Sequence, residues 1–189
     1  ALLARADVLV HGYRPGALDG LGMDSARRRE IAPSLIEVSL DAYGWTGPWA
    51  GRRGFDSLVQ MSCGIAEEGM RRTRAARPVP LPVQALDHAT GYLIAAATLR
   101  ALRLRRETGT VLSARLSLAR TASMLTGAGA GAMEGAGISE SSADLAPKIE
   151  MTGWGPAQRL QFPVQISGRF PSWQHPAGPL QTDKPNWVA

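Results

Sequence analysis

Short apolar runs alternate with longer amphipathic segments in the first part of the chain. Two runs rich in β-branched residues, 8–10 and 35–40, have the pattern of buried strands. The segment between them, 17–32, has a helical pattern that Pro33 should end. A strand, a helix and a second strand in this order predict parallel pairing in an α/β sheet with a partial Rossmann-like arrangement.

The next segments combine chain breakers with aromatic and basic residues. Residues 43–51 carry glycines and a proline among aromatic side chains, which predicts an ordered loop. A short helix is expected over residues 55–65. The arginine-rich stretch from there to Pro82 contains further prolines and is predicted to run extended.

The clearest helical signal begins at Asp87. Tyr92, Ala96 and Leu99 recur at three- and four-residue spacing, and Gly109 is a natural stop. A strand over 111–118 and a helix over 118–125 are expected to follow.

The C-terminal part has a different composition. Residues 127–137 are rich in alanine and glycine, which predicts a flexible linker or a poorly specified helix. We place a domain boundary near residue 145. Residues 1–145 are expected to form the α/β part, and residues 146–189, with their prolines and tryptophans, an extended and docked tail without a long periodic element.

Composition narrows the classes of protein. The chain has 189 residues, of which 44% are hydrophobic, enough for a packed core. Charges and prolines interrupt every apolar run before the length of about 18 residues that a membrane helix requires, so no membrane span is expected. Cys63 has no cysteine partner in the sequence, which favours a reducing, cytoplasmic location and a role as small core filler.

Arginine dominates the basic residues. The net charge is +5, and Lys148 and Lys184 are the only lysines. Guanidinium groups suit bidentate recognition of phosphate and carboxylate, so a nucleotide cofactor or an acidic substrate fits this composition. The arginine clusters at 27–29 and 71–74 lack interleaved aromatic residues, which disfavours nucleic acid as a partner.

Several common catalytic and binding motifs are missing from the sequence. The glycine-rich run 127–131 lacks the lysine and hydroxyl residue of a phosphate loop. His11, His88 and His175 have no spacing typical of metal ligands, so we expect no metal site. No serine occupies a Gly-x-Ser-x-Gly elbow, which leaves no basis for a serine hydrolase.

Two residues stand out by position. Arg14 follows a predicted strand end, where open α/β sheets collect their ligands. Asp87 comes just before a predicted helix, where an aspartate commonly caps the free amide hydrogens of the first turn. From the residues alone, capping is the favoured interpretation of Asp87, and most of the other arginines are expected to be solvated surface.

Four sequence blocks together resemble one family. They are residues 7–16 (DVLVHGYRPG), residues 43–48 with Tyr-Gly and Gly-Pro, residues 54–60 with Gly-Phe-Asp and Gln, and residues 87–91 with Asp and Thr-Gly. In this order and at this spacing they are similar to the class III CoA-transferases (the CaiB/BaiF type), which include carnitine-CoA transferase. The resemblance covers about residues 5–125.

The resemblance implies specific roles. Asp87 holds the place of the aspartate that attacks an acyl-CoA thioester and forms a mixed anhydride, and in this reading capping and catalysis are compatible. Tyr13, Arg14, Ala17 and Arg53 match positions that bind coenzyme A. Gly12 stands where the family motif often has asparagine, so one contact with the cofactor is missing.

The same resemblance leaves alternatives open. Phe55 and Gln60 are assigned to the substrate pocket, and Phe55 stands where the racemase branch of the family has a histidine. Transfer of CoA between an acyl-CoA and a carboxylic acid acceptor is therefore favoured over racemisation.

Family members are longer and form interlocked dimers. The present sequence begins without methionine and enters directly a strand-like run, so we expect it to be a piece of a longer protein. A homodimer or a partner chain is expected. A non-catalytic CoA-binding half that is completed by a partner chain is the remaining alternative.

Overall fold

The structure is a computed structural model, and it describes residues 1–128 and 139–187. The chain divides into two compact units, Ala1–Gly131 and Ala132–Ala189. The described helices are α1 (Ser25–Ile31), α2 (Asp56–Ser62), α3 (Ile65–Thr73), α4 (Ala85–Thr108) and α5 (Leu118–Gly127). The described strands are β1 (Val8–His11), β2 (Ile36–Asp41), β3 (Ser113–Ser117), β4 (Leu145–Thr152) and β5 (Gly155–Leu160). None of the helices in the described ranges is long and apolar enough to cross a membrane.

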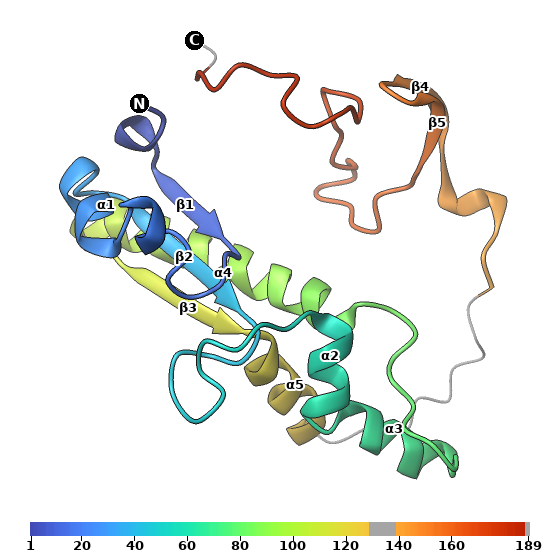
Figure 1. Cartoon of the computed structure of the whole chain (residues 1–189). Coiled ribbons are helices and arrows are strands. Elements are labelled where there is room, and N and C mark those ends of the chain that lie inside the picture. The colour runs from blue at the N-terminus through green and yellow to red at the C-terminus, as the bar shows by residue number, and fades with distance from the viewer. Residues whose placement is uncertain (129–138, 188–189) are drawn as a thin grey trace. The chain divides into compact units, whose positions relative to one another are not determined.

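The first unit is built on a parallel sheet with strand order β1-β2-β3. Val38 of β2 lies opposite Val10 of β1 and Ala114 of β3. Helix α4 runs along one face of this sheet, and α2 and α5 lie beyond the carboxyl ends of β2 and β3 (Figure 1). The α/β fold with a partial parallel sheet is therefore confirmed.

Two apolar clusters hold these layers together. In the first, Ile36 and Val38 of β2 pack with Ala101 of α4 beneath the sheet. In the second, α2, α4 and α5 meet around Val59 and Leu86, with Cys63 packed against the cluster as predicted for a core filler. The second cluster fixes the start of α4 relative to the carboxyl edge of the sheet.

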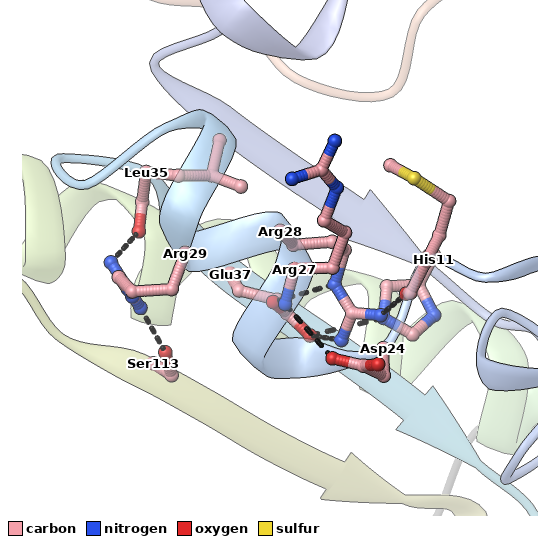
Figure 2. Close-up of polar contacts among 9 residues, drawn as sticks. His11, Asp24, Arg27, Arg28, Arg29, Leu35, Glu37 and Ser113 are labelled. Atoms are coloured by element: carbon pink, nitrogen blue, oxygen red, sulfur yellow. Dashed lines mark hydrogen bonds and ion pairs between the residues drawn. The ribbon is translucent and has the colours of Figure 1, made fainter.

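A partly buried ion pair ties α1 to the sheet. Arg28 donates from Nε to Glu37 Oε2 at 3.0 Å and from Nη2 to Glu37 Oε1 at 2.5 Å, and it also contacts the carbonyl oxygen of Met23. His11 Nε2 lies 3.5 Å from the same Glu37 carboxylate (Figure 2). Partial burial opposes ionisation of Glu37, but Arg28 and His11 outweigh it and lower the pKa of Glu37.

The helix predicted over residues 17–32 is shorter than expected. A 3-10 turn (Asp19–Leu21) ends at Gly22, whose φ of 70° is left-handed, and α1 starts only after Asp24. The Asp24 side chain accepts a hydrogen bond from the backbone N–H of Arg27 at 2.8 Å, which makes Asp24 the N-cap. Gly22 and Asp24 therefore divide the segment into a 3-10 turn and a helix, and the helical pattern of residues 17–32 did not show this division.

The prediction of an extended chain from residue 65 to Pro82 was wrong for its first half, where α3 forms. Glu68 pairs with Arg71 at 2.5 Å and with Arg72 at 2.7 Å, three and four residues along the helix. Ile65 and Ala66 are buried beneath this charged face. The prolines that predicted an extended chain begin only at Pro78, and the ion pairs of Glu68 stabilise a helix before them.

The second unit contains an antiparallel hairpin at the start of the segment that was predicted as an extended tail without a long periodic element. Strands β4 and β5 pair, with Thr152 opposite Gly155 across the turn. Thr152 Oγ1 donates to the Gly155 carbonyl at 2.7 Å and accepts from the Trp154 N–H at 3.2 Å, so its side chain closes the turn. Most of the predicted linker, 127–137, lies outside the described residues.

Candidate active site

A cavity of about 630 Å³ lies at the carboxyl end of the parallel sheet. Its walls come from the turn after β1, from the end of β2, from residues 52–55 and from the first residues of α4 and α5. Open α/β sheets bind ligands at this edge, because the loops that follow parallel strands meet there. The cavity is therefore the first candidate for a functional site.

The fold brings together almost all residues that the sequence nominated. The following line the cavity: Tyr13, Arg14, Ala17, Arg53, Phe55 and Asp87. Gln60 does not. It is 2% exposed, and its Nε2 donates to Asp56 Oδ1 and, at 3.0 Å, to the Val83 carbonyl, while its Oε1 accepts from the Leu81 N–H at 2.7 Å. These hydrogen bonds use the side-chain amide of Gln60 to hold the segment before α4. Gln60 therefore does not line the pocket to which the sequence assigned it.

The expectation that Asp87 caps a helix was wrong. Helix α4 begins at Ala85, Gln84 occupies the N-cap position without a side-chain hydrogen bond, and Asp87 lies in the first turn. Asp56 accepts the Asp87 N–H at Oδ2 over 2.8 Å, so a carboxylate from α2 satisfies one of the free amides of α4. The Asp87 carboxylate is left exposed at the cavity.

Two effects disfavour ionisation of Asp87. Desolvation raises its pKa, and the nearby charge of Asp56 raises it further, while His88 acts in the opposite direction. Thr90 of the same helix is buried, and its Oγ1 lies 2.7 Å from Thr121 Oγ1 of α5, which fixes this end of α4. Asp87 is thus a carboxylate on a rigid support with its basicity increased.

Unpaired arginines line the same cavity. Within the described ranges, the side chains of Arg14, Arg52 and Arg53 have no hydrogen-bonding or acidic partner. By contrast, Arg28 and Arg105 form ion pairs with Glu37 and Asp7. Unpaired guanidinium groups gathered around one cavity favour an anionic ligand.

The loop between β2 and α2 gives the cavity its other wall. Asp41, buried at the end of β2, accepts the Gly44 N–H at Oδ1 over 2.6 Å, and burial raises its pKa against the effect of this bond. At Gly54 a Cβ atom would lie 2.7 Å from the Ala42 Cβ and 2.9 Å from the Tyr43 ring. Only glycine lets the chain pass this point and direct its neighbours, Arg53 and Phe55, to the cavity.

A second cavity of about 490 Å³ shares the turn after β1 with the first. His11, Trp45 and Arg115 contribute to its walls, and the Arg115 guanidinium carbon lies 5.5 Å from the centroid of the Trp45 ring.

In residues 1–128 and 139–187, no group of three or more His, Cys, Asp or Glu side chains is placed to hold a metal ion.

The structure adds residues that sequence reasoning missed. Asp56 belongs to a block that the resemblance used, but its contact with Asp87 joins residues 31 positions apart and could not be seen in the sequence. Asp41 had a visible signal, since it ends a predicted strand at the edge where ligands bind. Arg52 was overlooked beside Arg53, although Trp49 three positions earlier offered a stacking partner.

Comparison with known proteins supports a family assignment. The model of CoA-transferase family III matches residues 1–151. The probable fatty acyl-CoA transferase Rv3272 of Mycobacterium tuberculosis is 40% identical over 104 residues, which are 55% of this chain and 26% of that protein. The succinyl-CoA–L-malate CoA-transferase beta subunit of Chloroflexus aurantiacus is 37% identical over 111 residues, 57% of this chain and 26% of that protein. The chain thus spans about a quarter of these curated relatives.

Solved structures agree. The orthorhombic crystal structure of Rv3272 matches with a TM-score of 0.59 and 31% identity, covering 67% of this chain and 35% of that one. A CAIB/BAIF family protein from Brucella suis matches with a TM-score of 0.56 and 24% identity over 82% of this chain and 42% of that one, which is a likeness of fold alone. The chain belongs to CoA-transferase family III.

Proposed function

We propose that this chain carries the nucleophile and part of the CoA site of an enzyme that transfers coenzyme A from an acyl-CoA thioester to a carboxylic acid. One observation carries the proposal: an exposed carboxylate, Asp87, shares one cavity with Arg14, Arg52 and Arg53, which lack acidic partners among the described residues. A thioester of coenzyme A needs both parts, a nucleophile for its carbonyl carbon and cations for its phosphates.

The proposed chemistry proceeds through Asp87. A carboxylate oxygen of Asp87 attacks the thioester carbonyl carbon, the C–S bond breaks, and the CoA thiolate leaves with the electron pair, which gives a mixed anhydride. The thiolate then attacks the aspartyl carbonyl carbon and expels the first acid, leaving an aspartyl-CoA thioester. An acceptor carboxylate then attacks the carbonyl carbon of the aspartyl-CoA thioester and expels the CoA thiolate, which gives a second mixed anhydride. The thiolate attacks the acyl carbon of the acceptor in this anhydride, which forms the new acyl-CoA and restores the Asp87 carboxylate.

The surroundings of Asp87 suit this role. A carboxylate with an ordinary pKa is a weak nucleophile, whereas the partial desolvation and the Asp56 charge that raise the pKa of Asp87 also increase its basicity. Asp56 accepts hydrogen bonds from the Asp87 N–H and from Gln60 Nε2. Neither bond involves the carboxylate of Asp87, so both of its oxygens stay available for attack.

The arginines suit the phosphates of coenzyme A. A guanidinium presents parallel N–H donors that match phosphate oxygens, and such charge-assisted bonds are stronger than neutral ones. Arg14 and Arg53 come from different loops, after β1 and before α2, and they face one cavity with Tyr13 and Ala17. The exposed ring of Phe55 is proposed to contact the acyl group, since it is the apolar aromatic wall beside Asp87.

A racemase of the same family fits less well. Proton exchange at the α-carbon needs a second acid/base group beside Asp87, and Phe55 offers none. His88 follows Asp87 in sequence but does not line the cavity. Exchange of the α-proton of a chiral 2-methylacyl-CoA in heavy water is the test, and the proposal predicts none.

A non-catalytic CoA-binding half remains the second candidate, and one observation favours it. Asp87 is exposed in this chain, and the chain spans about a quarter of its curated relatives. In this case a homodimer mate or a partner chain supplies the groups that exclude water from Asp87.

We also propose a cytoplasmic location for the enzyme, because the single Cys63 suits a reducing compartment.

Calorimetric titration with coenzyme A, followed by an assay for transfer from acetyl-CoA to a panel of carboxylic acids, tests the proposal. Binding with transfer supports the transferase, and binding without transfer supports the CoA-binding half. Arg14→Ala and Arg53→Ala should each weaken CoA binding by about 1–3 kcal/mol, the usual cost of a lost charge-assisted hydrogen bond. Absence of CoA binding by the unmodified chain contradicts both candidates.

A further inference from the structure

The loop that precedes α2 holds one arginine in a fixed position at the cavity. The Arg52 guanidinium carbon lies 4.5 Å from the centroid of the Trp49 ring, and Arg52 also lines the cavity that contains Asp87. A guanidinium stacked on an aromatic face uses its flat side for the contact. The N–H donors of a guanidinium lie in its plane, so stacking leaves them free for a ligand.

A chain of contacts anchors Trp49 itself. The Tyr43 ring meets the Trp49 ring edge to face, with centroids 5.0 Å apart and planes at 78°. The Tyr43 hydroxyl oxygen lies 3.0 Å from Ser62 Oγ of α2, within a hydrogen bond. Helix α2 thus positions Tyr43, Tyr43 positions Trp49, and Trp49 positions Arg52.

The backbone of the loop supports the same arrangement. The Arg52 N–H donates to the Trp49 carbonyl at 3.1 Å, and the Ala50 N–H donates to the Gly47 carbonyl at 3.2 Å. Two successive turns therefore bring Arg52 back over Trp49. A flexible surface arginine loses side-chain entropy when it binds a ligand, and an arginine already held by a ring and a turn loses less.

The positive charges of the arginines at this cavity favour binding of an anion. In the part of the chain that the structure describes, its guanidinium has no acidic partner, and Arg53 beside it and Arg14 across the cavity have none either. Three cations at one cavity repel each other until an anion neutralises them. Trp49 and Tyr43 add no charge, so their contacts leave this requirement unmet.

We propose that Arg52, held by stacking on Trp49, is a further binding residue for the phosphoryl groups of coenzyme A, and that Trp49 acts as its positioning residue. This inference rests on the proposed function, since the ligand of the cavity is taken to be a CoA thioester. The phosphoryl group can belong to the diphosphate or to the 3′-phosphate, and the ligands used in the test distinguish them.

The test compares the affinities of four single variants and one double variant for three ligands. Arg52→Ala should weaken CoA binding about tenfold, the loss expected for one charge-assisted contact. Trp49→Leu should weaken it about two- to fivefold, and Trp49→Phe, which keeps a ring, should recover part of the loss. Arg103→Ala removes a distant positive charge whose partner is Glu107, and it should leave the affinity unchanged.

The ligands separate a phosphate contact from a change in folding. Dephospho-CoA lacks the 3′-phosphate, and pantetheine lacks every phosphate. If Arg52 contacts the diphosphate, the loss in Arg52→Ala persists with dephospho-CoA; if it contacts the 3′-phosphate, the loss disappears. In both cases Arg52→Ala should bind pantetheine as the unmodified chain does, and the double variant with Trp49→Leu should lose no more CoA affinity than Arg52→Ala alone.

Three results would overturn the inference. The first is an unchanged CoA affinity in Arg52→Ala while the unmodified chain binds CoA, which removes Arg52 and leaves the proposed function standing. The second is an equal loss of affinity for pantetheine, which makes the effect structural. The third is additive losses in the double variant, which means that Trp49 does not act through Arg52. If the unmodified chain does not bind CoA, the proposed function falls together with the inference.

Discussion

The backbone N–H of Asp87 donates to Asp56 Oδ2 at 2.8 Å, a contact between the first turn of α4 and the first turn of α2. Asp56 is 2% exposed, and its other oxygen accepts from Gln60 Nε2. A buried carboxylate is tolerated only when such bonds satisfy it. The two aspartates therefore have different roles. Asp56 holds the first turn of α4, and Asp87 places its carboxylate at the cavity.

Substitutions of the two aspartates should therefore differ in their effect on stability. Asp56→Ala removes the acceptor of the Asp87 N–H and one of the two acceptors of Gln60 Nε2, and it should lower the free energy of unfolding by about 1–3 kcal/mol. Asp87→Asn changes only a charge in the first turn of α4 and should alter it by less than about 1 kcal/mol. Urea unfolding at pH 7 measures both. A larger loss in Asp87→Asn than in Asp56→Ala would show that Asp87, and not Asp56, holds the helix start.

The raised pKa of Asp87 predicts a pH dependence for the chemical step. Only the ionised carboxylate attacks, so the rate of covalent labelling should fall as the pH drops through the raised pKa. Asp56→Asn removes a like charge and should move this fall to lower pH. His88→Gln removes the group that lowers the pKa and should move it to higher pH. Identical profiles in the two variants would disprove the electrostatic coupling.

The Arg28–Glu37 pair predicts a loss of stability in acid. Because the folded chain lowers the pKa of Glu37 below the reference value of 4.5, the stabilisation is complete above that value and is lost as the pH falls through the lower, folded pKa. Glu37→Gln should therefore flatten the dependence of the unfolding free energy on pH in this range.

Breaking the same pair from the other side should be costly. Arg28→Ala leaves the partly buried Glu37 without its arginine partner and should cost about 1–3 kcal/mol at pH 7. Arg27→Ala is the matched control, because its partner Glu30 is on the surface, and it should change stability little. Equal effects of the two substitutions would mean that burial does not distinguish the pairs.

Gly54 predicts a steric requirement next to the site. In Gly54→Ala the new methyl group collides with Ala42 and Tyr43, which should cost about 1–3 kcal/mol of stability. Gly91→Ala is the control, because a Cβ at Gly91 of α4 meets nothing within 4 Å, and it should stabilise the chain by about 0.5–1 kcal/mol. Thermal unfolding compares them, and a tolerated Gly54→Ala would contradict the close approach.

Local patterns predicted the elements that depend on short-range spacing. The recurrence of Tyr92, Ala96 and Leu99 predicted α4, and Gly109 ends it with a left-handed φ of 71°. Strands β1 and β2 followed from their apolar runs, and β2, the central strand, is buried along most of its length. These features are fixed within one element, so the sequence carries them.

Contacts between distant segments were not predicted. The sequence placed Asp87 at the cap because nothing in it shows that Asp56 reaches the same amide from α2. Gln60 was assigned to the pocket for the same reason, although the bonds to Leu81 and Val83 bury it. Helix α3 was not predicted although Glu68 and its arginine partners lie at helical spacing, because the prolines near Pro82 were extended in the prediction to the whole stretch.

The proposed reaction depends on acylation of Asp87, and the acylated intermediate can be trapped. The chain is incubated with acetyl-CoA and then with hydroxylamine, and the peptide that contains Asp87 is analysed by mass spectrometry, with Asp87→Asn and Arg14→Ala treated alike. We expect a hydroxamate on Asp87 in the unmodified chain, less of it in Arg14→Ala because CoA binds more weakly, and none in Asp87→Asn. If an assembly that transfers CoA carries no hydroxamate on Asp87, or if Asp87→Asn keeps its transfer activity, Asp87 is not the nucleophile.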